Sequence, residues 1–409
     1  MFSTKSFSTT INGQTQKLIF IKRGFLFYYY CVVLGGYPRL ESSRWLSAVL
    51  NTHGVEHFIN VDLRGSIVSY EDLVHSKSLF LTGEMMSIEE FTLDAITPKW
   101  ESLHSFFQGK TTITEIAVAH FGLTNIDHEF DGLHRLCFLK LDNNQLTGSA
   151  LKKAFKNSNV TFDRKFCPNR PAKEKTRLDV KHCLVETLQD ALLPLVGLER
   201  ISLGSNELNR LHFSELPKRL EVIMAERNNI SVLNVSELRS LASLNIEYNQ
   251  LTSLKRSMLV APNNLLNLHQ FKAGYNKITN VDVDTFAGME KLYTIDLSDN
   301  KLSEINIDMF RRMHSKVWGE SSYYYYEERR ESTELKEDCK SIYVTDRIEG
   351  GETRIDRIYC VTGHIDLQRN KFNASMKLAV LDYFVHEHDF LRVGDGTVKH
   401  KKGAFQVHV

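Results

Sequence analysis

Asparagine recurs at one fixed place within a repeated framework of leucine-type residues, and this recurrence constrains the fold more than any other feature. The framework reads L-x-x-L-x-L-x-x-N-x-L, and five consecutive copies have asparagine in its place: Asn206, Asn228, Asn249, Asn276 and Asn300. Successive copies are offset by 22, 21, 27 and 24 residues, measured at Ile201, Ile223, Leu244, Phe271 and Ile295. A period of this length predicts an array of stacked structural repeats.

The x-L-x-L core of each copy predicts a short strand whose alternate side chains point into the stack. The asparagine follows where the chain turns away, and its amide can satisfy backbone N–H and C=O groups that the turn buries. We therefore predict an α/β fold, a leucine-rich repeat solenoid shaped as a curved horseshoe, with a parallel concave sheet and irregular insertions.

Weaker copies extend the array to about nine repeats. One copy has Asn144 in the asparagine place, and others have Phe121, Cys183 and Asn370 there. A degenerate first copy contains Ile88, Phe91 and Leu93, and a strand at Leu79 to Thr82 could cap it. The buried turn position predicts a structural role for Asn144 and for Cys183.

These copies and the segments that interrupt them predict five regions of the chain. They are a signal segment at 1–36, an N-terminal cap with the degenerate repeat at 37–110, the repeat array at 111–310, an insertion at 311–361, and the last repeat with a C-terminal segment at 362–409. We assign no role to residues 376–409.

Composition and charge indicate a folded protein and do not favour a role on nucleic acid or at a membrane surface. The chain has 51 basic and 50 acidic residues among 409, so its charge is almost balanced. The apolar stretch Phe25 to Leu34 follows Lys22 and Arg23, which is typical of a signal-peptide core. A buried N-terminal strand and a wrongly chosen start codon are the alternatives. No other segment is expected to cross a membrane.

Sequons and cysteines favour secretion, with reduced thiols in the cytosol as the alternative. Four N-x-S/T triplets predict glycosylation, at Asn159, Asn229, Asn234 and Asn373. Cys339 and Cys360 flank a span within the insertion and form the preferred disulfide. Cys167 could reach Cys183 if the latter is accessible, and Cys137 is expected on the solvent side, where an odd thiol could bridge two molecules.

The predicted binding surface is the column of residues between the two strand leucines of each repeat. Its members are Ala117, Lys140, Ser202, Met224, Asn245, Lys272, Asp296 and Asp366. Tyr248 and Tyr275 precede the asparagine in neighbouring repeats, where they either anchor a partner or stack on each other. Glu226 and Glu247 meet in the same way and should repel, which favours a basic partner or a bridging arginine.

Catalytic chemistry finds little support in the sequence, and we predict a non-enzyme without cofactor or metal. His386 and His388 are expected on a surface strand, without the helical spacing of a zinc protease or a third ligand. The run Tyr323 to Tyr326 has acidic neighbours, which is compatible with tyrosine sulfation, although a solvated loop is the commoner explanation.

The order of these parts resembles the insect leucine-rich immune proteins, best known from mosquitoes. The resemblance covers about residues 79 to 310 and is carried by the leader, the weak repeat at Ile88 to Leu93, and irregular repeats such as Leu220 to Ile230 and Leu241 to Leu251. It implies a secreted recognition factor of innate immunity that binds another protein, with a complement-like thioester-containing protein as the kind of partner expected. The competing hypothesis is an intracellular scaffold or adaptor.

Overall fold

The computed structural model of the chain describes two sets of residues. Backbone and side chains are described in 107, 113–120, 122–156, 158–165, 176–262, 267–289, 291–312, 365–386, 392, 396–397 and 406–409. The backbone alone is described for residues 166, 364, 387, 390–391, 393–394 and 398–400, and for the strands in 2–11, 14–23, 29–30, 32–33, 57–62, 87–94, 342–349 and 352–360. The expected cap at Leu79 to Thr82, the tyrosine run and Cys339 lie outside these residues.

The chain divides into two compact units. Unit 1 comprises residues 1–170, 174–208 and 214–220. Unit 2 comprises residues 171–173, 209–213 and 221–409. Each unit contains consecutive repeats of the asparagine framework, and each is described by itself.

Unit 1 is a stack of parallel strands in which successive repeats pair in register. The strands are β5 (His57–Asp62), β6 (Ser87–Asp94), β7 (Glu115–Ala119), β8 (Phe138–Lys140), β9 (Arg177–Asp179) and β10 (Arg200–Ser202). Helix α3 (Gly148–Lys156) connects two of these repeats and buries Leu151 and Phe155. The degenerate first copy is therefore a strand of the array, and the array extends upstream of it to β5.

The N-terminal segment of unit 1 contains further strands. A hairpin pairs β1 (Phe2–Ile11) with β2 (Gln14–Arg23) in antiparallel register. Within the apolar stretch, β3 (Tyr29–Tyr30) and β4 (Val32–Val33) pair with β5. The strand alternative to a signal peptide matches this backbone, while the signal segment itself stays a prediction.

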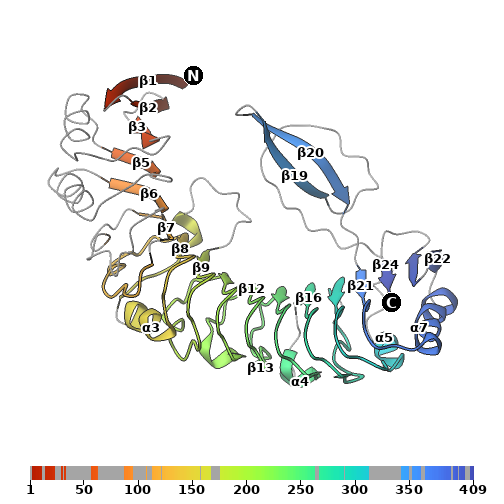
Figure 1. Cartoon of the computed structure of the whole chain (residues 1–409). Coiled ribbons are helices and arrows are strands. Elements are labelled where there is room, and N and C mark those ends of the chain that lie inside the picture. Colours follow the sequence, from red (N-terminus) through yellow and green to blue (C-terminus); the bar gives the residue numbers. More distant parts are fainter. Residues whose placement is uncertain are drawn as a thin grey trace. The chain divides into compact units, whose positions relative to one another are not determined.

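Unit 2 continues the same construction, and its strands also pair in register. The main sheet contains β12 (Val222–Met224), β14 (Ser243–Asn245), β16 (Gln270–Lys272), β18 (Thr294–Asp296) and β21 (His364–Asp366). The opposite side of the repeats carries short elements, namely β11 (Arg210–His212), β13 (Val232–Asn234), β15 (Ser253–Leu254), β17 (Asn280–Val281), α4 (Arg256–Leu259) and α5 (Asp308–Arg312). Figure 1 shows β12 and β16 on one side of this unit and β13 and α4 on the other.

Buried asparagine amides join neighbouring repeats within each unit. The Nδ2 of Asn249 donates to the carbonyl oxygens of Ala225 and Ile246 at 3.0 and 3.1 Å, and its Oδ1 accepts the N–H of Ile230 at 2.9 Å. Equivalent bonds are made by Asn144, Asn206, Asn276, Asn300 and Asn370. Asn228 donates to the carbonyl oxygens of Ala225 and Glu226 in its own turn.

These amides and strands confirm the predicted parallel-strand leucine-rich repeat solenoid. The core consists of the leucine-type residues of the pattern, among them the fully buried Ile223 and Phe271, together with aromatic residues from the opposite side of the repeats. Phe271 packs against Phe286 with ring centroids 5.5 Å apart. Each repeat therefore buries its apolar residues only against its neighbours.

The second interruption leaves the main sheet unbroken. Strands β18 and β21 pair directly, with Ile295 opposite Ile365, although the segment between them contains the antiparallel hairpin of β19 (Ile342–Glu349) and β20 (Glu352–Cys360). Asn370 spans the same gap, since its Oδ1 accepts the N–H of Leu302 at 3.1 Å. The segment is thus an excursion from a continuous array.

The C-terminal segment closes the end of unit 2. Strand β24 (Gln406–His408) pairs with β21 in parallel and with β23 (Thr397–His400) in antiparallel register, and β23 pairs with β22 (Phe390–Gly394). Helix α7 (Ala374–Glu387) buries Phe384, whose ring meets that of Phe310 edge-on at 5.1 Å. Residues beyond the last repeat therefore cover an apolar core that would otherwise be open.

Candidate functional site

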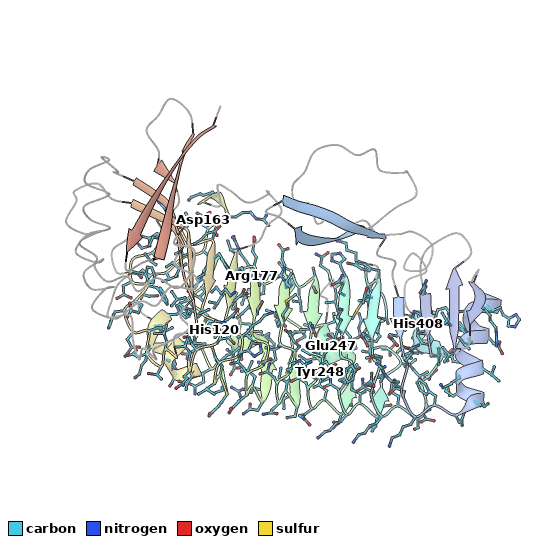
Figure 2. The ribbon with its side chains drawn as sticks, turned by 45° about the horizontal axis from the view of Figure 1, so that its top comes forward. His120, Asp163, Arg177, Glu247, Tyr248 and His408 are labelled. Atoms are coloured by element: carbon cyan, nitrogen blue, oxygen red, sulfur yellow. The ribbon has the colours of Figure 1, made fainter. Side chains whose placement is uncertain are left out.

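Most of the predicted binding residues lie together on the exposed face of the main sheet in unit 2. We call this set the sheet-face patch; its members are Met224, Glu226, Asn245, Glu247, Tyr248, Lys272, Tyr275 and Asp296. Because the strands pair in register, Met224, Asn245, Lys272 and Asp296 form one row across β12, β14, β16 and β18. Glu247 and Tyr248 lie beside each other just beyond β14 (Figure 2).

Two tyrosines of the patch stack as parallel rings with an arginine at each end. The ring centroids of Tyr248 and Tyr275 are 4.1 Å apart at an interplanar angle of 9°. The guanidinium carbon of Arg227 lies 4.4 Å from the centroid of Tyr248, and that of Arg369 lies 5.6 Å from the centroid of Tyr275. We call these four residues the tyrosine ladder. Cation–π contact and ring stacking both stabilise it.

Every ladder residue has a left-handed backbone, with φ of 55° or 56°. The backbone N–H of Tyr248 donates to the carbonyl oxygen of Gly274 at 3.0 Å, and that of Tyr275 donates to Ser298 at 2.9 Å, so bonds between repeats hold this conformation. A residue with a Cβ pays about 1–2 kcal/mol in this region, and asparagine tolerates it best. The place before the buried asparagine is nevertheless occupied here by arginine and tyrosine.

Glu247 is the carboxylate with the most perturbed surroundings in the patch. Burial is the main cause that raises the pKa of Glu247 above its ordinary value, with Asp296 and Glu226 adding to the rise and Lys272 opposing it. The predicted repulsion between Glu226 and Glu247 is thus present. Lys272 of the next repeat attracts Glu247.

The row of strand residues also has a structural task. The Oδ1 atoms of Asn245, Asp296 and Asp366 accept the backbone N–H two residues ahead at 2.9 to 3.0 Å. Such bonds hold the turn that follows each strand. Gly274 leaves room for this arrangement, because a Cβ there would lie 3.0 Å from the Oδ1 of Asp296. Asn245 and Asp296 therefore present only part of their polar groups to a partner.

Lys140 lies on the equivalent face of unit 1, in a different setting. Its Nζ is 3.8 Å from an oxygen of Asp142, and Asp179 is opposite Lys140 in register. Asp179 is almost fully buried and accepts from the Nε of Arg177 at 2.6 Å, on the strand that Figure 2 marks at Arg177. Burial raises the pKa of Asp142, and its Oδ1 accepts the N–H of Lys181 at 2.7 Å. The bond from Lys181 to Asp142 joins two repeats of unit 1, whereas each of the two ion pairs lies within a single repeat.

The sheet face differs from the sequence prediction in one residue that is buried and in three residues that the prediction left out. Ser202 was placed on the exposed column but is fully buried. Asp179 occupies the same column and was missed, although its place between Leu178 and Val180 is the signal that finds it. Arg227 and Arg369 were also missed, and both stand one residue before a framework asparagine, as the two tyrosines do.

The sequons lie away from the strands of the main sheet. Asn159, Asn229 and Asn373 are exposed, and the Oδ1 of Asn373 accepts the N–H of Met376 at the start of α7. Asn234 ends β13 on the opposite side of the repeats and is half-buried, with its Oδ1 bonded to the hydroxyl of Ser236 at 2.8 Å. None of the four asparagines belongs to the sheet-face patch.

The cysteines differ from what the sequence led us to expect. Cys137 is buried rather than solvent-facing, and it is disulfide-bonded rather than an odd thiol. Cys183 is a free, buried thiol, and burial raises its pKa to about 11. Its Sγ lies 3.5 Å from the carbonyl oxygen of Leu141, which is the kind of contact that the framework asparagine makes. The expected pairing of Cys339 with Cys360 lies outside the described side chains.

Potential metal ligands are scattered over the described residues. Within those residues, no three side chains of histidine, cysteine, aspartate or glutamate gather as a metal site would require. His386 belongs to helix α7 and not to a surface strand, which corrects the expectation from sequence, and it is exposed. Among the described helices, none combines the length and apolar character needed to cross a bilayer.

Comparisons with known proteins agree with the repeat pattern. A family model described as leucine rich repeat matches residues 267–315. Lumican from Gallus gallus and lumican from Coturnix japonica are each 27% identical to this chain over 188 residues, which cover 44% of this chain and 48% of the relative. The chain thus matches about half the length of these curated relatives.

Solved structures similar to this chain include several with leucine-rich repeats. An internalin from Listeria monocytogenes matches with a TM-score of 0.49 and 15% identity, covering 86% of this chain and 84% of that one. A leucine-rich repeat protein from Bacteroides eggerthii matches at 0.47 and 18%, covering 62% and 42%. The leucine-rich repeat domain of APL1B matches at 0.43 and 18%, covering 65% and 68%.

Proposed function

We propose that this leucine-rich repeat protein binds another protein through the sheet-face patch of unit 2. We further propose that it does so outside the cell, where it acts as a recognition factor of innate immunity. The observation that carries the proposal is the row arrangement of the patch. In-register strands place apolar, basic, acidic and aromatic side chains at regular spacing on one exposed face. A mixed surface with stacked tyrosines suits recognition of a protein, because large rigid rings contribute contact area at small entropic cost.

The sequons and one cysteine support the extracellular part of the proposal. Asn159, Asn229 and Asn373 are accessible to a glycosyltransferase, and the patch contains no sequon. Cys137 is disulfide-bonded, and disulfides persist in oxidising compartments but are rare in the cytosol. An intracellular adaptor would need neither feature.

The immune part of the proposal rests on the resemblance to insect leucine-rich immune proteins. That resemblance also names the first partner to try, a complement-like thioester-containing protein. A purified protein of this class, immobilised and exposed to the full chain, tests this partner directly, and absence of saturable binding would remove it without affecting the wider proposal.

Secretion is tested by expressing the full chain in insect cells. We expect recovery of the protein from the medium, with a mobility that increases on treatment with an N-glycosidase. Mass spectrometry of the non-reduced tryptic digest should place Cys137 in a disulfide. Retention in the cytosol without glycans or disulfide would contradict the proposal and favour the adaptor.

The use of the patch is tested with a photo-crosslinking amino acid in place of Met224. The matched control places the same amino acid at Val232, which is exposed on the opposite side of the repeats in β13. We expect a specific crosslinked protein partner from Met224 and none from Val232. Equal crosslinking from both positions, or crosslinking from Val232 alone, would contradict binding through the sheet face.

A further inference from the structure

The two arginines of the tyrosine ladder differ in their polar partners. Arg369 donates from Nε to the Oδ2 of Asp299 at 2.7 Å, and its guanidinium donates to the hydroxyl of Tyr275 at 3.0 Å. Arg227 has the same place in its repeat and the same backbone conformation, and its guanidinium covers Tyr248 in the same way. Arg227 is exposed, and no carboxylate among the described residues pairs with it.

A chain of hydrogen bonds runs along the ladder toward Arg227. The hydroxyl of Tyr275 accepts from Arg369 and is hydrogen-bonded to the hydroxyl of Tyr248. This second bond is the largest cause that raises the pKa of Tyr275. Because the hydroxyl of Tyr275 already accepts from Arg369, it can donate its own proton to Tyr248. The proton of the Tyr248 hydroxyl is then available to an acceptor from outside, and a donor that is itself accepting is a stronger donor.

The ring geometry adds to the same electrostatic character. The two tyrosines cover each other, and the arginines cover the outer ring faces, so mainly ring edges and hydroxyls remain exposed. Aromatic edges carry partial positive charge, whereas the covered faces carry the negative part. The exposed part of the ladder near Arg227 therefore combines a guanidinium, a hydroxyl donor and positive ring edges.

We propose that Arg227 and the hydroxyl of Tyr248 bind a carboxylate of an acidic segment of the protein partner. Asp299 is the template for this contact, because it pairs with Arg369 at the other end of the ladder. The partner's carboxylate would give Arg227 the ion pair that Asp299 gives Arg369. This inference rests on the proposed function and adds the chemistry of the contact that orients the partner.

The acidic residues of the patch do not satisfy this position. Glu247 is drawn to Lys272 in the following repeat, on the strand side of the ladder. A basic partner would be attracted to Glu226 and Glu247 but would be repelled by Arg227. The two partner chemistries therefore make opposite predictions for substitution of Arg227.

The experiment uses the full chain and a fluorescein-labelled peptide of alternating aspartate and glycine, with a lysine–glycine peptide as its counterpart. Fluorescence anisotropy at physiological ionic strength should show saturable binding of the acidic peptide alone. Arg227→Gln should weaken it about tenfold, as expected for loss of one charge-assisted hydrogen-bond pair. Tyr248→Phe retains the ring and should weaken binding about threefold or more. Arg239→Gln, at an exposed arginine outside the ladder, should leave binding unchanged.

Several outcomes would overturn the inference. They are the absence of saturable binding, equal or tighter binding of the lysine peptide, unchanged binding in Arg227→Gln, and an equal loss in Arg239→Gln. Displacement of the acidic peptide by heparin at far lower concentration would assign the site to a sulfated polysaccharide instead. Thermal unfolding of each variant shows whether a loss of binding reflects a loss of fold, and Tyr248→Phe provides the test if Arg227→Gln is destabilised.

The two experiments together distinguish failure of the carboxylate site from failure of protein binding by the patch. If crosslinking from Met224 persists while Arg227→Gln binds the acidic peptide like the unaltered chain, the patch binds a protein but the carboxylate site is wrong. If crosslinking from Met224 fails while the acidic peptide binds through Arg227, the site exists without the proposed function.

Discussion

At the scale of single residues, the framework asparagine does what no apolar residue of similar size can do. The amide of Asn249 donates to carbonyl oxygens in its own and the preceding repeat, and it accepts one N–H, all within a buried turn. We expect Asn249→Leu to lower the free energy of unfolding by about 3 kcal/mol, because buried backbone groups lose their partners. Urea unfolding followed by circular dichroism measures this loss. The control is Asn280→Ala at an exposed asparagine, and an equal loss in both variants would contradict the prediction.

Substitution of Glu247 shows whether the charge of this carboxylate lowers the stability of the folded chain. A carboxyl whose folded pKa is raised contributes stability that is complete below its unfolded pKa and is lost as pH rises through the folded pKa. Above that pKa the folded chain carries the cost of a half-buried charge. We expect Glu247→Gln to be as stable as the unaltered chain or more stable by about 0.5 kcal/mol or less, since exposure screens the charge.

The measurement for Glu247→Gln is the unfolding temperature between pH 4 and pH 8. The advantage of the variant at pH 7 should disappear toward pH 4, and the control Glu237→Gln, outside the patch, should show no such trend. A destabilised variant at pH 7 would mean that the attraction to Lys272 outweighs burial. A residue kept for binding need not contribute to stability, so a neutral or stabilising effect of Glu247→Gln is compatible with a role of Glu247 in the patch.

The role of a single residue could be predicted from the sequence where that role is set within its own repeat. The asparagine places could be read directly, because each amide serves the turn that contains it. Ser202 and Asp179 stand in the same column as Lys140, but their burial depends on the side chains of the neighbouring strand, which the period does not specify. The left-handed backbone before each asparagine was also not predicted, since tyrosine and arginine give no sign of it.

At the scale of elements, close approach of backbones limits which residues fit between repeats of unit 1. A Cβ added to Gly197 would lie 1.7 Å from the carbonyl oxygen of Phe162, so the backbone must shift. We expect Gly197→Ala to cost about 2 kcal/mol in unfolding free energy. Gly132→Ala is the matched control, because a Cβ there meets nothing within 4 Å and only its positive φ opposes alanine. A smaller loss for Gly197→Ala than for Gly132→Ala in thermal unfolding would refute the steric explanation.

Elements with a strong period were predictable, and elements held by pairing outside the period were not. Strands β12 to β18 follow from the framework, and β21 follows from Ile365 and Leu367. The pairing of β18 with β21 across a long excursion could not be read from spacing, because loop length says little about which strands meet. The hairpin of β1 and β2 was missed although Asn12 and Gly13 form a typical two-residue turn signal between alternating strands.

At the scale of the whole molecule, each unit lacks a central core, so its stability depends on neighbouring repeats and on the elements that cover their ends. Residues 376–409 carry no repeat pattern and were therefore left unassigned, whereas the structure places α7 and β22 to β24 over the last repeats of unit 2. The repeat pattern could not predict that these residues form a cap, because a cap follows the last repeat and does not share its sequence pattern. Its buried aromatic residues, however, make the role testable.

Phe384 is the residue on which the end of unit 2 most depends. It is fully buried against Phe310 and Tyr383, at ring-centroid distances of 5.1 Å for each. We expect Phe384→Ala to cost about 3–5 kcal/mol, through the lost apolar contact and the cavity left behind. Leu378→Ala on the same helix is the control, since Leu378 is half exposed and should cost little.

The distribution of this loss distinguishes a solenoid from a globular core. With nearest-neighbour coupling, native-state hydrogen exchange of Phe384→Ala should accelerate most at the amides of Leu367 and Leu297, next to the cap, and progressively less at Ala273 and Ile246. These amides bond across successive repeats, so each reports one step along the array. Uniform acceleration at all four amides would mean that unit 2 unfolds as a single cooperative body, and the additive description of its repeats would then fail.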